Sequence, residues 1–455
     1  MTSAVWKDGN IRRDSAVFIS IAIILVTLVT LFIGDYGIAA IIGLFFLLLL
    51  MYVGNDAMSM ALIVIVIVTH HYSYIIGLNS LIRDRNIILF LALVVYGSDK
   101  YVRGGAGYIS RTPRSLMIVI VFIIGFMLWG IVKGNKRVFL WQDTSWFLSI
   151  LSYFPLAQYF SKRINIDHGI NVLLAVTSIM SMGAVLQFYR TNHRSISNAE
   201  MFIPIAIMIA LALVLYLKQT LRYKAMLLCV LLINSFGVFV SLTRSLWISL
   251  ILGLFLIVAL FFAQNRQRIS GGNVRRVVAS ICLLLSLVFI MLYANAPLWD
   301  QVVVRFKMIF MGGYDISTLY RLLEMKEMVL YLKDHLVIGD GMGAVVSIPF
   351  SLTTQGRISN GTPYMHNTFL YWVLKFGLFF SFIWLAMWYR IIKDLVNHCT
   401  WETDAGLKAI KIGLLLGLFT ITVFSMAAPV LSASTGMFYL GFVLAVFYPG
   451  KRIRR

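Results

Sequence analysis

The sequence predicts an all-α, polytopic membrane protein of about 12–14 transmembrane helices with one large, partly helical outer loop. Of its 455 residues, 60% are hydrophobic and only 13% are charged, and the mean hydropathy is +0.88. Apolar runs recur along the chain and continue to its end. A water-soluble protein cannot hide this much apolar surface, so most of the chain is expected to lie in lipid.

Each crossing of a bilayer needs about 17–25 apolar residues as helix, because lipid offers no partner for free backbone groups. The apolar runs predict spans at Ala16–Ile33, Ile38–Val53, Ala57–Leu78, Ile87–Tyr96, Ser115–Val132, Trp146–Phe160, Ile170–Phe188, Phe202–Leu217, Ala225–Val240, Leu246–Ala263, Val277–Tyr293, Phe369–Trp388, Ala409–Ala427 and Ser432–Tyr448. Ile87–Tyr96 is short for a crossing and is equally compatible with a re-entrant segment. No cleavable signal peptide is expected, because no small-residue cleavage site follows the first run.

Basic residues gather in alternate short loops and at both ends of the chain, near Lys7–Arg13 and at Lys451–Arg455. This pattern predicts cytoplasmic N- and C-termini and places the long polar segment on the outer face. The net charge of +21 has three explanations that stay open: cytoplasmic anchoring, attraction to anionic headgroups, and binding of an anionic substrate.

Three parts are predicted along the chain: a transmembrane bundle of about eleven spans over 1–293, an extracytoplasmic loop over 294–365, and C-terminal transmembrane helices over 366–455. Within the loop, 317–335 is expected as an amphipathic helix whose leucines fall largely on one face. A Gly-rich turn, Ile338–Gly343, should end it. Because this turn follows a helix and no strand, a nucleotide-binding loop is not expected.

Two arginines near the outer face are candidate ligands for an anionic group. Arg244 lies between two apolar spans, so it is expected either to anchor the protein at the headgroups or to bind a phosphate through its planar fork of donors. Arg321 lies on the amphipathic helix, at the edge of the face expected to be buried. Its alternative role is an intrahelical pair with Glu324, three residues later.

His366 stands where the chain re-enters the membrane and is the candidate general base. A histidine side chain normally titrates near neutral pH, which suits proton transfer, although a structural role is the alternative. His335 is a second candidate base, but its place at a helix end makes a capping role the simpler interpretation.

No catalytic metal and no cofactor are expected. No two aspartates stand two residues apart, as metal-dependent nucleotide-sugar enzymes use, and the H-E-x-x-H and G-K-[ST] patterns are absent from the sequence. Cys229, Cys282 and Cys399 cannot build a disulfide framework or a metal cluster.

The order of three features carries a family resemblance. An arginine precedes an apolar span in Ser241–Ala259, an Arg-led helix ends in Gly-x-Gly-x-Gly within Tyr320–Ala344, and HNTFLYWVLKFGLFF follows at His366–Phe380. In this order they resemble the superfamily of O-antigen ligases and O-antigen, capsule or exopolysaccharide polymerases, which are integral membrane glycosyltransferases. The resemblance covers about Asn234 to Leu378, and Gln187–Ala206 is similar to the family's polar segment before a mid-chain span.

The resemblance implies transfer of a glycan from a polyprenyl-diphosphate carrier at the outer face of the bacterial cytoplasmic (inner) membrane. Arg244 and Arg321 would stabilise the negative charge of the diphosphate leaving group. His366 would take the proton of the acceptor hydroxyl. Direct attack with inversion at the anomeric carbon would need no metal.

Secondary contacts to the substrate are expected from Arg190, Arg194 and Asn367. The partners implied are the lipid-linked glycan donor, a glycan or lipid-core acceptor, membrane lipids, and flippase and chain-length regulator proteins. No nucleic acid is expected.

Three functions remain open at this point. The first is a polymerase that extends a lipid-linked chain, and the second is an O-antigen ligase that moves a finished glycan onto lipid A core or a protein. The third is a flippase or transporter for lipid-linked sugars, which predicts ionisable residues in the middle of spans. The sequence offers few such residues, because Lys375 and Lys411 are expected near span ends.

Overall fold

The computed structural model describes residues 113–191, 201–217, 220–264, 293, 296–310, 316–333, 335–346, 365–428 and 430–449. The expected spans at 16–33, 38–53, 57–78 and 87–96, and nearly all of 277–293, lie outside the described residues. The helices are α5 (Arg114–Val132), α6 (Arg137–Leu148), η2 (Ser149–Ser152), α7 (Tyr153–Tyr159), α8 (Arg163–Thr191), α9 (Phe202–Tyr216), α10 (Leu221–Val240), α11 (Arg244–Gln264), α13 (Ala296–Phe310), α14 (Ile316–Leu332), α15 (Thr368–Trp401), α16 (Ala405–Phe424) and α17 (Ser434–Phe447).

The described part of the chain contains six helices that are long and apolar enough to cross a membrane, namely α5, α8, α10, α11, α15 and α16. Two shorter apolar helices, α9 and α17, stand where spans were predicted. The prediction of an all-α, multi-pass membrane protein is therefore confirmed.

One predicted span differs in shape from the expectation. Instead of a single helix over Trp146–Phe160, the chain forms α6, η2 and α7 in succession, starting already at Arg137. Pro155 lies in the first turns of α7. Because proline has no N–H and its ring clashes with the carbonyl four residues earlier, a continuous α-helix through this point is disfavoured. The η2 turn at Ser149–Ser152 lies between α6 and α7.

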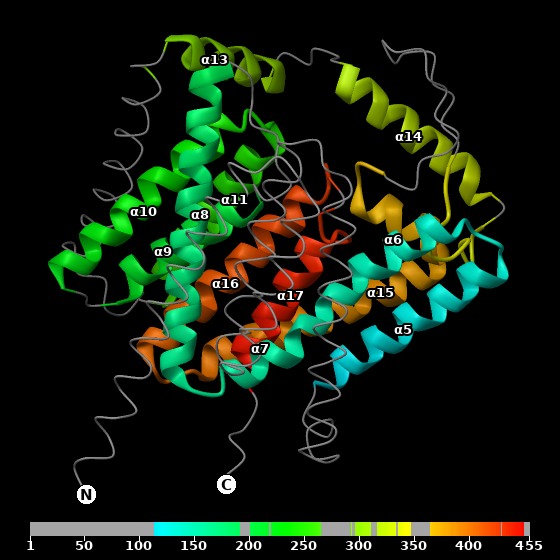
Figure 1. The fold of residues 1–455 in the computed structure, drawn as a ribbon, viewed down its shortest axis with the longest axis horizontal. Helices are drawn as coiled ribbons and strands as arrows, with labels where there is room; N and C mark the ends of the chain where they lie inside the picture. The colour runs from blue at the N-terminus through cyan, green and yellow to red at the C-terminus, as the bar shows by residue number, and fades with distance from the viewer. Residues whose placement is uncertain are drawn as a thin grey trace, which may run out of the picture.

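The centre of the bundle is α9, which is enclosed by α8, α10, α11 and α16 (Figure 1). Every residue of α9 from Phe202 to Leu213 is buried. This explains why α9 shows no polar face, since a helix surrounded by other helices needs none. α17 packs beside α16 and against α7.

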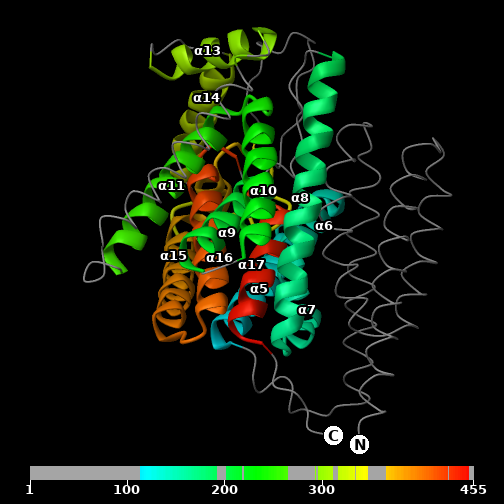
Figure 2. The ribbon, with the colours of Figure 1, turned by 90° about the vertical axis from the view of Figure 1, so that its left-hand side faces the viewer.

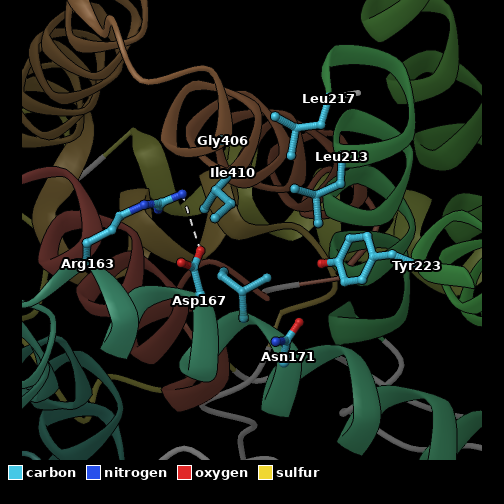
Figure 3. Close-up of a pocket in the computed structure, with 9 residues that line it drawn as sticks. Arg163, Asp167, Asn171, Leu213, Leu217, Tyr223, Gly406 and Ile410 are labelled. Carbon is cyan, nitrogen blue, oxygen red and sulfur yellow. Dashed lines mark ion pairs between the residues drawn. The ribbon is translucent and has the colours of Figure 1, made fainter. Parts of the chain in front are cut away.

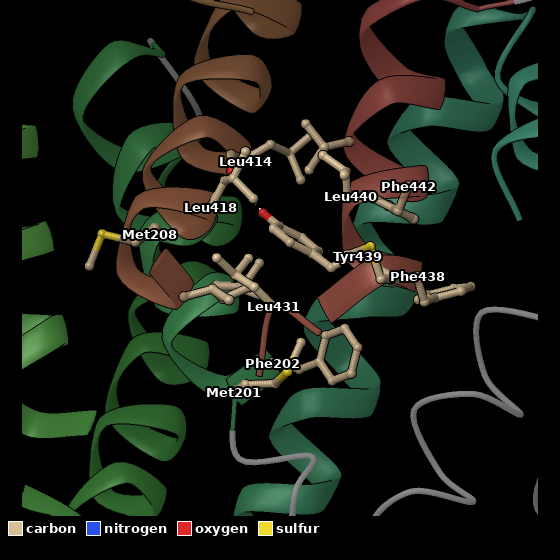
Figure 4. Packing of buried hydrophobic residues seen from close by; sticks show 14 of the residues in the cluster. Met201, Phe202, Met208, Leu414, Leu418, Leu431, Phe438, Tyr439, Leu440 and Phe442 are labelled. Carbon is tan, nitrogen blue, oxygen red and sulfur yellow. Dashed lines mark hydrogen bonds between the residues drawn. The ribbon is translucent and has the colours of Figure 1, made fainter. Parts of the chain in front are cut away.

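The contact between α16 and α17 shows how the interior is filled. Tyr439 of α17 lies among Leu414, Leu418 and Leu431, with its hydroxyl turned towards α16 (Figure 4). That hydroxyl donates a hydrogen bond to the carbonyl oxygen of Leu414 at 2.8 Å. A buried tyrosine needs such a partner, because an unmade hydrogen bond in an apolar interior is costly.

At one end of the bundle, α13 and α14 lie across the ends of the membrane helices (Figures 1 and 2). The predicted amphipathic helix 317–335 is confirmed as α14, which ends slightly earlier, at Leu332. α15 runs further than its predicted end at Trp388 and contains one break, at Gly377, where φ is 82°.

Close helix contacts in the bundle depend on glycine. In α16, a Cβ at Gly413 would lie 2.6 Å from the Cα atom of Ile209 in α9. The backbones of the two helices therefore approach each other at this point more closely than any larger residue permits, as small residues allow in membrane helix packing.

We predict that Gly413→Ala lowers the thermal stability of the purified protein, because the added methyl group meets backbone that no side-chain rotation can move. Gly125→Ala in α5 is the matched control, since a Cβ there meets nothing within 4 Å. The control should be neutral or gain up to about 1 kcal/mol of helix propensity. Thermal unfolding in detergent measures both. Equal melting temperatures for the two variants would contradict the packing assigned to Gly413.

Candidate active site

His366 lies just before α15 and contacts a carboxylate of α14. Its ring Nδ1 is 2.9 Å from Oε1 of Glu324, and its backbone N–H donates to Oε2 of the same residue at 3.1 Å. The Glu324 side chain is 1% exposed, whereas the His366 side chain is 35% exposed. The site thus has a buried acceptor on one side of the imidazole and a ring that still reaches the surface.

The start of α15 fixes the position of His366. The side chain of Asn367 caps the helix, with Oδ1 accepting from the N–H groups of Phe369 and Leu370, and its Nδ2 donates to the carbonyl of Met426 at 2.9 Å. The N–H of Thr368 donates to the carbonyl of Ser425 at 3.0 Å. The Asn367 side chain therefore joins α15 to the segment after α16, and its expected contact with substrate stays a prediction.

α14 presents a different face to the protein from the one expected. Glu324 and Met328 are buried, whereas Leu322, Val329 and Leu330 are exposed. The expectation that the leucine-rich side is the buried one is wrong in this structure. Helical spacing shows which residues share a face, but it cannot tell whether that face meets protein or surroundings.

Arg321 lies on the same side of α14 as Glu324, one turn earlier, and is partly buried. Residues three apart on a helix are neighbours, so Arg321 lies next to the residue that contacts His366. Both carboxylate oxygens of Glu324 accept hydrogen bonds from His366. The Arg321–Glu324 pair stays a prediction. The spacing Arg-x-x-Glu is visible in the sequence, but it does not indicate that Glu324 contacts His366.

Arg244 is the first residue of α11 and is partly buried. The turn before it includes Leu242, which is buried and has φ of 52°, a conformation that bulky residues rarely adopt. Trp247 closes this turn, with Nε1 donating to the carbonyl of Val238 at 2.9 Å. α11 begins at the end of the bundle that carries α13 and α14 (Figure 2). The three predicted catalytic residues therefore belong to elements that meet this one end.

The other predicted contacts are less defined. Arg190 stands in the last turn of α8, but its side chain is not among those described, and Arg194 lies outside the described residues. Their role in binding substrate stays a prediction.

The Gly-rich segment Ile338–Ala344 is a packing element. It lies between α5 and α15, and Gly339 and Gly341–Ala344 are buried. The N–H groups of Asp340 and Gly341 donate to carbonyls of α15, and that of Met342 donates to a carbonyl of α5, at 2.9–3.2 Å. These amides are therefore engaged in hydrogen bonds within the protein.

Two pairs of glycines allow this approach. A Cβ at Gly339 would lie 2.6 Å from the backbone nitrogen of Gly377, where α15 is broken. A Cβ at Gly341, whose φ is 79°, would collide with the backbone of Gly130 in α5. The glycine spacing of the segment therefore serves contact between backbones, in conformations that other residues avoid.

A buried ion pair completes this packing. Nζ of Lys375 lies 2.6 Å from Oδ2 of Asp143 in α6, and both side chains are fully buried. Asp143 also accepts hydrogen bonds from the hydroxyl of Tyr371 and the N–H of Gly343, each at 2.7 Å. The Lys375 ammonium donates to the carbonyl of Ala344 at 2.6 Å. Lys375 lies in the first part of α15, and its charge is buried in the protein interior, where Asp143 compensates it.

His335 follows the end of α14 and has a capping role, as expected. Its Nδ1 lies 3.0 Å from the carbonyl of Tyr331, and its Nε2 lies 3.3 Å from Oδ1 of Asp340. The ring stacks on Tyr331 at a centroid distance of 4.0 Å. Burial, and then the charge and hydrogen bond of Asp340, raise the pKa of the Tyr331 hydroxyl, which therefore stays a neutral donor. Both ring nitrogens of His335 are thus occupied by acceptors of the protein.

A cavity of about 330 Å³ lies at the opposite end of the bundle, between α8, α9, α10 and α16 (Figure 3). Arg163 and Asp167 stand at one side of it, 3.3 Å apart, and Tyr223 faces them across it. None of the predicted catalytic residues lines it. The cavity is therefore separate from the His366 site.

Among the residues that the structure describes, no cluster of His, Cys, Asp or Glu could hold a metal ion. Cys229 and Cys399 are free thiols, and Cys282 lies outside the described residues.

We predict that Lys375→Met destabilises the protein by about 3–5 kcal/mol, because it leaves the Asp143 carboxylate buried without its cation. The double variant K375M/D143N should recover part of this loss, since the amide that replaces the carboxylate still offers an oxygen to Tyr371 and Gly343. Unfolding of both variants in detergent measures the difference. If K375M were as stable as the wild type, the ion pair would not hold α6 and α15 together.

The comparison with known proteins covers the same part of the chain. Residues 227–385 match a family model described as O-Antigen ligase, whereas no curated protein matches the chain. The matched range runs from α10 to α15 and contains Arg244, Arg321, Glu324 and His366, but not Asp143. The resemblance stated from the sequence is confirmed over residues 227–385, which are similar to the O-antigen ligase family.

Proposed function

We propose that this protein is a glycosyltransferase that polymerises polyprenyl-diphosphate-linked oligosaccharide units at the outer face of the bacterial cytoplasmic membrane. The single observation that carries the proposal is the His366 imidazole, which is held by Glu324 at 2.9 Å and still reaches the surface beside α14. A sugar hydroxyl is a poor nucleophile until a base withdraws its proton, and a histidine placed in this way is suited to that task.

The reaction we propose is a direct displacement. His366 takes the proton of the acceptor hydroxyl, whose oxygen forms a bond to the anomeric carbon of the donor. The bond from that carbon to the diphosphate oxygen breaks, with inversion, and the polyprenyl diphosphate leaves with the electron pair. Arg244 and Arg321 stabilise the charge that develops on the leaving group, and Arg190, Arg194 and Asn367 contribute to binding.

The exposed apolar side chains of α14 favour a substrate that is linked to a lipid. Leu322, Met325 and Val329 are exposed on the side of α14 away from Glu324. An amphipathic helix with such a face can lie in the boundary between headgroups and acyl chains. A catalytic histidine next to it would meet a diphosphate whose polyprenyl chain remains in the membrane.

A ligase is the second candidate, and one observation favours it: the matching family model is described as O-Antigen ligase. The two reactions share donor and leaving group and differ in acceptor. With purified protein and a synthetic donor, a ladder of repeat-unit multiples supports the polymerase. Product that forms only after lipid A core is added supports the ligase.

The flippase alternative gains no support from the interior of the described helices. Lys375 does lie within a span, but Asp143, Tyr371 and Ala344 enclose its ammonium group. Such a pair fixes helices together, whereas a transport path needs ionisable groups that a substrate can reach. Flippase and chain-length regulator proteins remain proposed partners only.

We predict that His366→Ala, Arg321→Ala and Arg244→Ala each lower glycan transfer by at least about 100-fold, as expected for loss of a general base or of a cation at the leaving group. Turnover of a synthetic polyprenyl-diphosphate oligosaccharide measures this. Controls are His398→Ala and Arg390→Ala in the later part of α15, which should retain activity. Any of the three catalytic variants that keeps full activity is removed from the mechanism.

We further predict that Val329→Glu lowers the use of a long-chain polyprenyl donor more than that of a short-chain, water-soluble analogue. A charge on this face opposes contact with lipid. Lys326→Glu is the control, because it places the same side chain at an exposed position that is already charged. Equal losses with both donors would show that the face does not bring α14 to the membrane surface.

A further inference from the structure

The carboxylate of Glu324 is buried, and burying a carboxylate costs free energy unless it has strong partners. Its side chain is 1% exposed, and an ionised carboxylate taken out of water needs strong partners. Both of its oxygens accept from one residue, His366, which is 42 positions further along the chain. This carboxylate is therefore directed at the proposed base and at the backbone that carries it.

The two hydrogen bonds have different consequences. The bond from the backbone N–H to Oε2 fixes the carboxylate against the chain just before α15. The contact of Oε1 with Nδ1 then determines which nitrogen of the imidazole carries the proton. An ionised carboxylate only accepts hydrogen bonds, so Nδ1 must carry the proton, and Nε2 becomes the basic nitrogen of the neutral imidazole. The same negative charge stabilises the imidazolium that forms once Nε2 has taken a proton.

A purely structural tether does not account for this arrangement. The start of α15 already has its cap, because Asn367 accepts from two backbone N–H groups and binds the carbonyl of Met426. Helix anchoring would also be served by the backbone bond to Oε2 alone. The second oxygen, at 2.9 Å from Nδ1, orients a side chain that takes no part in that cap.

The contrast with His335 separates the two histidines near α14. The nitrogens of His335 contact the carbonyl of Tyr331 and the carboxylate of Asp340, so its ring closes the end of its own helix. In His366, Nδ1 and the backbone N–H both contact the Glu324 carboxylate, which belongs to another helix. Of the two candidate bases, His366 is therefore the one whose ring and backbone share a single buried carboxylate.

We infer that Glu324 is the positioning residue of His366, holding the tautomer in which Nε2 accepts the proton of the acceptor hydroxyl. The inference rests on the proposed function and adds a residue to it. Glu324 touches neither donor nor acceptor in this account. It acts through the imidazole, as carboxylates commonly do behind a functional histidine.

The test is Glu324→Gln in the full-length, detergent-purified protein, with a synthetic polyprenyl-diphosphate donor. Glutamine keeps the volume and can still accept from the backbone N–H of His366, but it removes the charge and can donate to Nδ1, which reverses the tautomer. We expect kcat to fall about 10–100-fold with an unchanged KM for the donor. Glu327→Gln, one turn later on the same helix, is the matched control and should keep wild-type kcat.

Glu324→Asp keeps the charge and guards against a Gln variant that does not fold. Its kcat should lie between those of the wild type and E324Q, again with an unchanged KM. Wild-type kcat in E324Q, or a kcat loss matched by an equal loss of donor binding, would overturn the inference. If H366A is inactive while E324Q is fully active, only the role of Glu324 fails. If H366A itself is fully active, the proposed function has lost its base.

Discussion

The buried pair of Lys375 and Asp143 is the interaction on which the geometry of this end of the protein depends. It joins α15 to α6 without exposure to solvent, and the carbonyl of Ala344 and the N–H of Gly343 bind to the same two side chains. The Gly-rich segment, which follows α14 along the chain, is thereby held between α5 and α15. The pair therefore fixes the segment that follows α14, the helix that carries Arg321 and Glu324.

The candidate site forms where the start of α15 meets the middle of α14. The buried side of α14 supplies a carboxylate, and the capped start of α15 supplies a histidine whose backbone and ring both bind it. The outer side of α14 is apolar, so the reactive groups lie directly beneath a surface suited to lipid. This arrangement fits a reaction in which one substrate remains in the membrane while a hydroxyl group is activated at its edge.

The sequence predicted the class of protein, most described spans and the helix α14, because apolar runs and helical spacing are local properties. It could not predict that Asp143 and Lys375 meet, since partners so far apart along the chain leave no local signal. Glu324 was visible beside Arg321, but only the fold turns it towards His366. The leucine-rich face of α14 was identified correctly as a face, and its direction was wrong, because periodicity does not say what covers it.

The measurement that tests the account most directly is the release of polyprenyl diphosphate by the purified protein, followed together with glycan transfer. This leaving group is common to polymerase and ligase, so its release reports the central claim whichever acceptor is used. The account predicts that wild-type protein, given donor and a suitable acceptor with EDTA present, releases one diphosphate carrier for each glycan transferred. It also predicts that H366A releases none. Absence of release from the wild type, or equal release by H366A, would contradict it.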